Sequence, residues 1–287
     1  MLSFKSVTRD IHSFADCLVR HVSRVNIPNS HSEYAPIEMN EWWPWYKRIA
    51  KAFDYSQEKD QEATEMLSQL LMSRSSLITE FSKVLNDRKV IVFGAGPSLE
   101  TDLGKLVELN LLCHFKTVAA DGATSALLSL AKMIPDIIVS DLDGPLWDLV
   151  AAVTKGSKII IHAHGDNMEL LRSSVSSFSR ALGSTQVSPS RNVYNFGGFT
   201  DGDRAVFLAK AMHASSVVLA GMDFGKKIGK YSKFRVQHPE VKLRKLQFGK
   251  SLLEWLAERG GTQYYNITDA GEQIVGFRQV EPKQLRS

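Results

Sequence analysis

Short apolar runs recur along the chain from Lys89 onward, and the first of them covers residues 90–93. Further runs with strand character lie at 117–120, 136–140, 158–162, 193–196, 217–220 and 264–267. Segments long enough for crossover helices or loops separate most of them, such as 101–112, 123–132, 166–181 and 202–213. Continuous apolar strands that alternate with helical segments are typical of a parallel sheet covered on both faces. The pattern predicts an α/β, Rossmann-like fold with a mostly parallel sheet, whose ligand site lies at the carboxyl ends of the strands.

The segment before this sheet has a helical pattern. In residues 39–86, leucines and aromatic residues recur at spacings close to three and four, as an amphipathic helix requires. Its first turns hold Trp42, Trp43 and Trp45, which can anchor packing or stack on a heterocyclic substrate, and packing is the favoured interpretation. We predict three parts: an N-terminal extension at 1–38, a helical segment at 39–86 and an α/β domain at 87–287.

The extension carries scattered basic residues, histidines and serines, and we expect it to be helical or partly disordered. Asp10 and Asp16 argue against a transit peptide, which is normally poor in acidic residues. A start at Met39 is an alternative, because the aromatic-rich segment begins there.

Composition narrows the class of protein. The chain has 287 residues, of which 44% are apolar and 23% charged, with a formal net charge of +4. These values are ordinary for a soluble globular protein, and they favour neither a nucleic-acid partner nor a membrane span. Two cysteines, Cys17 and Cys113, cannot form a disulfide framework or a zinc cluster. We therefore expect a cytoplasmic protein with small anionic ligands.

Acidic residues follow two of the predicted strands. Asp121 comes directly after the run at 117–120, and Asp141 and Asp143 follow the run at 136–140. Residues two apart on an extended chain point the same way, so Asp141 and Asp143 are expected to share one side. Three clustered carboxylates repel one another unless a cation lies among them, and oxygen ligands suit Mg²⁺. Two alternatives stay open at this point: Asp121 can bind a ribose, and these acids can merely cap helices.

A glycine-rich turn follows the first strand. Gly94, Gly96, Pro97 and Ser98 lie between that strand and the next helical segment, where backbone N–H groups can approach a phosphate. The dinucleotide fingerprint is incomplete, since its third glycine position holds Leu99. The turn is a candidate site for phosphate or nucleotide.

Later strand ends offer further polar groups. Asp166 and Asn167 follow the run at 158–162 and are expected to approach metal, nucleotide or substrate, whereas His162 is interpreted as a satisfied strand residue. Around the next two strand ends lie Asn195, Asp201, Arg204 and Asp223. Arg204 can bind a phosphate bidentately or form a surface ion pair.

A basic run occupies residues 226–245, where lysines and arginines far outnumber the single acid, Glu240. A solvated loop is the default explanation. Because the run directly follows a strand that ends at the acidic rim, it can also cover a triphosphate, with Lys226 as the residue nearest the strand end. A helix at about 246–259 ends at a glycine pair.

Taken together, these motifs resemble a known family. Ala-Asp-Gly at 120–122 and Pro-Asp-Ile-Ile-Val-Ser-Asp-Leu-Asp-Gly at 135–144 look like the catalytic core of thiamine pyrophosphokinases. The fuller set is more similar to the archaeal 6-hydroxymethyl-7,8-dihydropterin pyrophosphokinase family: Phe-Gly-Ala-Gly-Pro-Ser-Leu at 93–99, His-Ala-His-Gly-Asp-Asn at 162–167, Phe-Gly-Gly-Phe-Thr-Asp-Gly-Asp-Arg at 196–204 and Gly-Met-Asp-Phe at 221–224. Thiamine enzymes have Asp-Lys-Asp-x-Thr-Asp where this chain has His-Ala-His-Gly-Asp-Asn, here called the histidine motif. The likeness covers roughly 40–270.

The resemblance implies a diphosphokinase that transfers diphosphate from ATP to the hydroxymethyl oxygen of the pterin and releases AMP, in methanopterin or other folate-type cofactor biosynthesis. Residues 87–287 would then be the catalytic domain. By the same resemblance Asp121, Asp141 and Asp143 would be catalytic and bind Mg²⁺. The remaining candidates divide into two sets. Those for ATP are Gly94, Gly96, Pro97, Ser98, Asp166, Asn167, Arg204 and Lys226, and those for the pterin alcohol are Asn195, Asp201 and Asp223.

Three alternative functions stay open: a thiamine pyrophosphokinase, a glycosyltransferase-like enzyme related to flagellin-modifying proteins, and a nucleotide-binding module without chemistry. The sequence is compatible with a homo-oligomer.

Overall fold

The apolar runs form the strands of one sheet in the computed structural model, which describes residues 34–72, 77–232, 238–269 and 271–286. Within these residues the strand order is β6-β5-β4-β3-β2-β1-β7-β8-β9, and every neighbouring pair is parallel. The strands are β1 (Lys89–Phe93), β2 (Lys116–Ala120), β3 (Ile137–Ser140), β4 (Lys158–His162), β5 (Ala181–Ser184), β6 (Val193–Tyr194), β7 (Ser216–Ala220), β8 (Gln263–Asn266) and β9 (Arg278–Gln279). The predicted parallel α/β sheet is confirmed.

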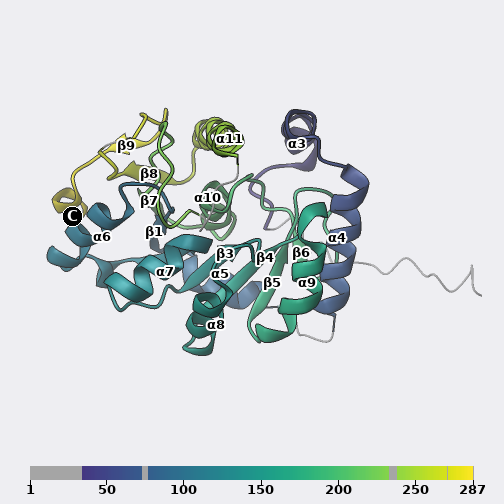
Figure 1. Cartoon of the computed structure of the whole chain (residues 1–287). Coiled ribbons are helices and arrows are strands. Elements are labelled where there is room, and N and C mark those ends of the chain that lie inside the picture. The colour runs from purple at the N-terminus through teal and green to yellow at the C-terminus, as the bar shows by residue number, and fades with distance from the viewer. Residues whose placement is uncertain (1–33, 73–76, 233–237, 270, 287) are drawn as a thin grey trace, which may run out of the picture. The chain divides into compact units, whose positions relative to one another are not determined.

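Helices cover both faces of the sheet (Figure 1), and alternate strand residues pack against them. On one face Val90 and Val92 pack with helices α3 (Met39–Phe53), α5 (Ile78–Leu85), α10 (Asp201–Ala211) and α11 (Pro239–Ala257). On the other face Ile91 and Phe93 pack with α6 (Leu99–Glu108) and α7 (Asp121–Leu130), and Ile159 and Ile161 pack with α4 (Gln57–Leu70), α8 (Leu146–Thr154) and α9 (Met168–Ser174). The strands are buried on both faces, which explains their unbroken apolar runs.

Several predicted boundaries were wrong. Strand β5 begins at Ala181, inside a segment expected to be a crossover, because its sequence Ala-Leu-Gly-Ser carries little strand signal of its own. Helix α8 and strand β9 were not anticipated, and α11 begins at Pro239 rather than near Leu246. The strand predicted at 193–196 is only two residues long.

The described residues of the predicted helical segment, 39–72 and 77–86, contain the helices α3, α4 and α5. Helix α3 ends where Asp54 adopts a left-handed conformation (φ 56°), and Ser56 caps α4 by accepting a hydrogen bond from the Lys59 N–H. Of the predicted parts, residues 1–33 lie outside the described residues, and the division at residue 86 stays a prediction. Cys17 also lies outside them, and Cys113 is an exposed free thiol. Among the described residues, no helix is long and apolar enough to span a membrane.

The strand order reverses between β1 and β7. Chain continuing from β1 enters α6 on one face, and chain continuing from β7 leads to α11 on the other. Such a reversal opens a crevice beyond the carboxyl ends of the strands, which is where open α/β sheets bind their ligands.

Candidate active site

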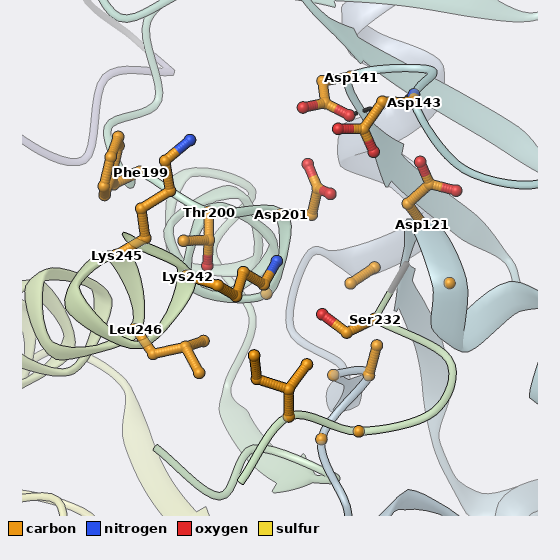
Figure 2. A pocket seen from close by; sticks show the side chains of 18 of the residues that line it. Asp121, Asp141, Asp143, Phe199, Thr200, Asp201, Ser232, Lys242, Lys245 and Leu246 are labelled. Carbon is orange, nitrogen blue, oxygen red and sulfur yellow. Dashed lines mark hydrogen bonds between the residues drawn. The ribbon is translucent and has the colours of Figure 1, made fainter. Parts of the chain in front are cut away.

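A cavity of about 320 Å³ lies at the carboxyl ends of the strands, as the fold predicts. It is lined by residues from the loops after β1, β2, β3, β4 and β7, by the start of α10 and by α11. Figure 2 shows the acidic residues Asp121, Asp141 and Asp143 on one side of this space and the α11 residues Lys242, Lys245 and Leu246 across from them. The cavity therefore joins strand ends that are far apart in the sequence.

Asp121 is the most buried member of the acidic group, with 4% of its surface exposed. It is the first residue of α7, directly after β2. Its Oδ2 accepts hydrogen bonds from the Ser140 hydroxyl (2.9 Å) and from the Gly144 N–H (3.0 Å), while its Oδ1 is buried with no hydrogen-bond partner. A buried carboxylate oxygen without a partner is costly unless a ligand completes it.

Asp141 and Asp143 lie in a tight loop and not on an extended strand, so the geometric reason given for their pairing was wrong. Leu142, between them, adopts a left-handed conformation (φ 68°) and is buried. The Leu142 N–H donates to the Ser140 hydroxyl oxygen (2.8 Å). Leucine rarely adopts this conformation, so the surrounding contacts must stabilise it. The loop still brings both carboxylates toward Asp121.

The histidine motif after β4 holds Asp141 in place. The Asn167 amide donates to the backbone oxygens of Asp141 (2.9 Å) and His162 (2.7 Å). The His164 Nδ1 accepts a hydrogen bond from the Asp166 N–H, which leaves its Nε2 facing the Asp141 Oδ2 at 3.6 Å. Asn167 thus acts through Asp141, whereas the side chain of Asp166 is 71% exposed at the cavity mouth.

His162 lies at the end of β4 as a buried residue, and its Nδ1 pairs with the Ser184 hydroxyl at 3.2 Å. Burial, with Arg204 and His164 nearby, lowers its pKa well below the usual range, so the ring is neutral. It also lines the cavity.

One oxygen from each of Asp121, Asp141 and Asp143 lies within 4.8 Å of the others. Burial, followed by the charges of Asp141 and Asp143, raises the pKa of Asp121. Burial, followed by the charges of Asp141, Asp121 and Asp143, also raises the pKa of Asp201, which lies at the start of α10 and faces this group (Figure 2). Such repulsion is relieved by a cation, and three carboxylates with one unpartnered oxygen suit Mg²⁺.

The glycine turn lines the cavity, but the N–H groups of Gly94, Gly96 and Ser98 bind other protein atoms. Gly94 and Gly96 donate to the backbone oxygens of Ala220 (2.9 Å) and Gly221 (2.8 Å). The Ser98 N–H and hydroxyl both donate to Asp223 Oδ2, at 3.2 and 3.0 Å, and Ser98 does not line the cavity. A protein carboxylate thus occupies the anion position at the start of α6, which does not match the phosphate cradle expected from the sequence.

Two predicted ligand contacts lie elsewhere. Arg204 is neither at the surface nor in the cavity wall: it is 1% exposed and donates to the backbone oxygens of Gly197 (3.2 Å) and Phe199 (3.1 Å). Asn195 is also buried outside the cavity, since its amide donates to Val187 O and accepts from the Gly197 N–H. Both side chains are used to shape the turn at 195–199.

The basic run contributes other lysines than the one predicted. Lys226 is exposed and does not line the cavity, whereas Lys227, Lys242 and Lys245 do. Lys242 and Lys245 extend from α11 toward the cavity (Figure 2). The run was visible in the sequence, but only the start of α11 at Pro239 decides which of its side chains point inward.

Sequence reasoning also missed Tyr55, Phe199 and Gln186, all of which line the cavity. No motif includes Gln186 or Tyr55. Phe199 lies within the motif at 196–204, but no role was predicted for it. The tryptophans are packing residues, as favoured: Trp42 is buried, its Nε1 donates to Gln186 O at 2.8 Å, and none of the three lines the cavity.

Comparison with known proteins identifies the family of this chain. The sequence model described as "6-hydroxymethylpterin diphosphokinase MptE-like" matches residues 62–229. A protein of Pyrococcus furiosus named 6-hydroxymethyl-7,8-dihydropterin pyrophosphokinase is 46% identical over 232 residues, which cover 78% of this chain and 96% of the relative. This chain belongs to the MptE-like family. Proteins of the same name from Methanocaldococcus jannaschii and Methanothermobacter thermautotrophicus are each 39% identical, over 78% of this chain and 97% of each relative.

The MptE-like fold has a structural neighbour. The MAf glycosyltransferase of Magnetospirillum magneticum superposes on 78% of this chain with a TM-score of 0.50 and 14% sequence identity. The match spans only 39% of that glycosyltransferase. At this identity the likeness concerns the fold alone.

Proposed function

We propose that this MptE-like chain transfers the diphosphoryl group of ATP to the hydroxymethyl oxygen of 6-hydroxymethyl-7,8-dihydropterin and releases AMP, with Mg²⁺ as the metal. The relatives named for this pyrophosphokinase support the substrate pair. The observation that carries the proposal is the acidic group of Asp121, Asp141 and Asp143 in the wall of a cavity that also holds lysines.

The three carboxylates would hold Mg²⁺, which neutralises phosphate oxygens and favours in-line attack on phosphorus when it is bound. The residues of the chain supply the remaining effects. The turn at Leu142 and the contacts of Asn167 and His164 fix the carboxylates before substrate arrives, so little reorganisation accompanies the reaction.

Two further groups have roles in this proposal. The lysines of α11 stand across from the carboxylates (Figure 2), where their charge can stabilise phosphate oxygens and the departing AMP. Asp201 faces the same space and is the carboxylate suited to accept a hydrogen bond from the pterin hydroxyl.

The test is incubation of the protein with ATP, MgCl₂ and 6-hydroxymethyl-7,8-dihydropterin, followed by measurement of product mass and of AMP. The expected product is the pterin diphosphate, formed in equal amount with AMP. Thiamine in place of the pterin is the control alcohol and is expected to give no product. Formation of ADP and a monophosphate, or equal turnover of thiamine, would contradict the proposal.

A further inference from the structure

Two chemically different groups of residues line the cavity besides the acidic group. One group, here called the glycine end, consists of Gly94, Gly96, Gly221 and Gly229, with the Asp223 carboxylate beside them. The other group contains the rings of Tyr55 and Phe199, here called the aromatic corner. The two substrates of a diphosphoryl transfer must approach the metal site from different directions, so each group must take one of them.

Both rings of the aromatic corner line the cavity, and both also contact Phe53, at centroid distances of 5.9 Å for Tyr55 and 5.1 Å for Phe199. The ring centroids of Tyr55 and Phe199 are 6.3 Å apart with an interplanar angle of 58°. A flat heterocycle can stack on one ring and meet the other at an angle, which is a favourable aromatic arrangement. The Lys245 Nζ lies 5.4 Å from the Tyr55 centroid and 5.8 Å from the Phe199 centroid. The positive charge of Lys245 therefore lies beside the aromatic corner, where it can attract the phosphate groups that are transferred to the ligand.

Both rings are held by backbone contacts made before any ligand binds. The Phe199 N–H donates to Asp203 Oδ2 (2.5 Å), and its carbonyl accepts from Arg204. Tyr55 lies in the short turn between α3 and α4, with its N–H bonded to Ala50 O at 3.0 Å. A preorganised aromatic surface loses little conformational entropy when a ring binds to it.

A buried amide in the cavity wall can recognise polar edges of the ligand. Gln186 lines the cavity and is 2% exposed, and its Nε2 donates to Asp60 Oδ2 at 2.8 Å. Asp60 is itself fixed by the Tyr46 hydroxyl (2.8 Å) and the Gly165 N–H (2.8 Å). With its nitrogen engaged, Gln186 offers its amide oxygen to a ligand, and a pterin ring carries N–H donors that match an acceptor.

The glycine end suits the nucleoside of ATP instead. It lies where the strand order reverses between β1 and β7, the usual nucleotide position in open α/β sheets. A Cβ at Gly96 would lie 2.1 Å from Asp223 Oδ2 and 2.5 Å from Gly221 O, so the wall there is closely packed. The Asp223 carboxylate can accept hydrogen bonds from ribose hydroxyls, as acidic residues in dinucleotide-binding folds do.

We propose that the aromatic corner of Tyr55 and Phe199, with Gln186, is the binding site of the pterin ring, and that the glycine end holds the nucleoside of ATP. The assignment rests on the function proposed above. It gives the helical segment before the sheet a direct role, because Tyr55 contacts the substrate and Asp60 positions Gln186.

The test measures each ligand separately. Dissociation constants are determined for 6-hydroxymethylpterin, through its own fluorescence, and for Mg-ATP, by calorimetry, each without the other. Tyr55→Ala is expected to weaken pterin binding about 5- to 100-fold, the range for loss of one ring–aromatic stack, and to leave ATP binding within about twofold. Trp147→Ala is the matched control, because it removes a ring that is 87% exposed and does not line the cavity, and both constants are expected to stay unchanged.

Phe199→Leu is the second variant, since it keeps an apolar side chain in the core and removes only the flat ring. It is expected to weaken pterin binding about 5-fold or more, with the thermal melting curve confirming the fold. Weaker ATP binding with unchanged pterin binding in both variants would overturn the assignment and place the adenine at the corner. If the unmodified protein forms pterin diphosphate, such a result refutes this inference alone. If it neither binds the pterin nor forms that product, the proposed function fails and the inference fails with it.

Discussion

Gly144 is the position where a single added carbon should most directly damage the acidic group. A Cβ built there would lie 2.2 Å from Asp121 Oδ1, 2.6 Å from its Cγ and 2.7 Å from its Oδ2. Ordinary contacts of a Cβ begin at 3.4 Å, so Gly144→Ala requires the carboxylate or the loop to move by about 1 Å. Asp121 cannot yield without losing its bonds to the Ser140 hydroxyl and the Gly144 N–H.

A misplacement of about 1 Å at a reacting centre costs on the order of 100-fold in rate. We therefore expect Gly144→Ala to lower AMP release about 100-fold at saturating ATP and pterin, and to raise the Mg²⁺ concentration needed for half-maximal rate. The assay is AMP release during a Mg²⁺ titration, with thermal melting to verify the fold.

Gly104 offers a matched control on α6, because a Cβ there would meet no atom within 4 Å. Gly104→Ala is expected to leave AMP release unchanged and to stabilise the protein by about 0.5–1 kcal/mol, the usual gain in a helix. Full activity with an unchanged Mg²⁺ requirement in Gly144→Ala would refute the argument that Asp121 must keep its position.

Three further predictions concern other acidic residues. Asp143→Asn is expected to abolish AMP formation with an unchanged melting temperature, because Asp143 is exposed; near-normal turnover would contradict its role as a metal ligand. Asp102→Asn keeps an acceptor oxygen for the three donors now bound to Oδ2. Burial raises the folded-state pKa of Asp102, so above pH 3.8 the folded wild type binds more protons than its unfolded chain and loses stability as the pH rises. Urea unfolding of both proteins should therefore show the variant gaining stability relative to the wild type as the pH rises above 3.8. A stability difference independent of pH would contradict this. Asp60→Ala leaves three donors near Asp60 unsatisfied and is expected to lower the free energy of unfolding in urea by about 3 kcal/mol or more, and a loss below about 1 kcal/mol would contradict the buried network.

The sequence predicted the site best where the position of a residue at a strand end was enough to place its side chain. Asp121, Asp141 and Asp143 directly follow buried strands, and parallel strands bring their carboxyl ends to one edge of the sheet, so the acidic group could be foreseen. The local reason was less secure: Asp141 and Asp143 converge through the left-handed turn at Leu142, which no sequence rule predicts for leucine.

For other candidate residues, the sequence could not show which side chains bind the protein and which reach the cavity. Asn195 and Arg204 have the side chains of ligand-binding residues, but the fold uses both to satisfy backbone groups of the turn at 195–199. Lys242 and Lys245 were indistinguishable from Lys226 in the basic run until the start of α11 fixed which side chains face the cavity.

The sequence by itself determined the fold class and the acidic chemistry of the site, because strand burial follows from local apolar patterns, and strands that alternate with helices form parallel sheets. Only the tertiary structure decided which polar groups remain available to a ligand and which wall is aromatic. Its hydrogen bonds join distant residues, such as Asp60 with Gly165, 105 positions later, and with Gln186, 126 positions later. Whether a side chain binds the protein or a ligand depends on such partners, and their spacing along the chain carries no local signal.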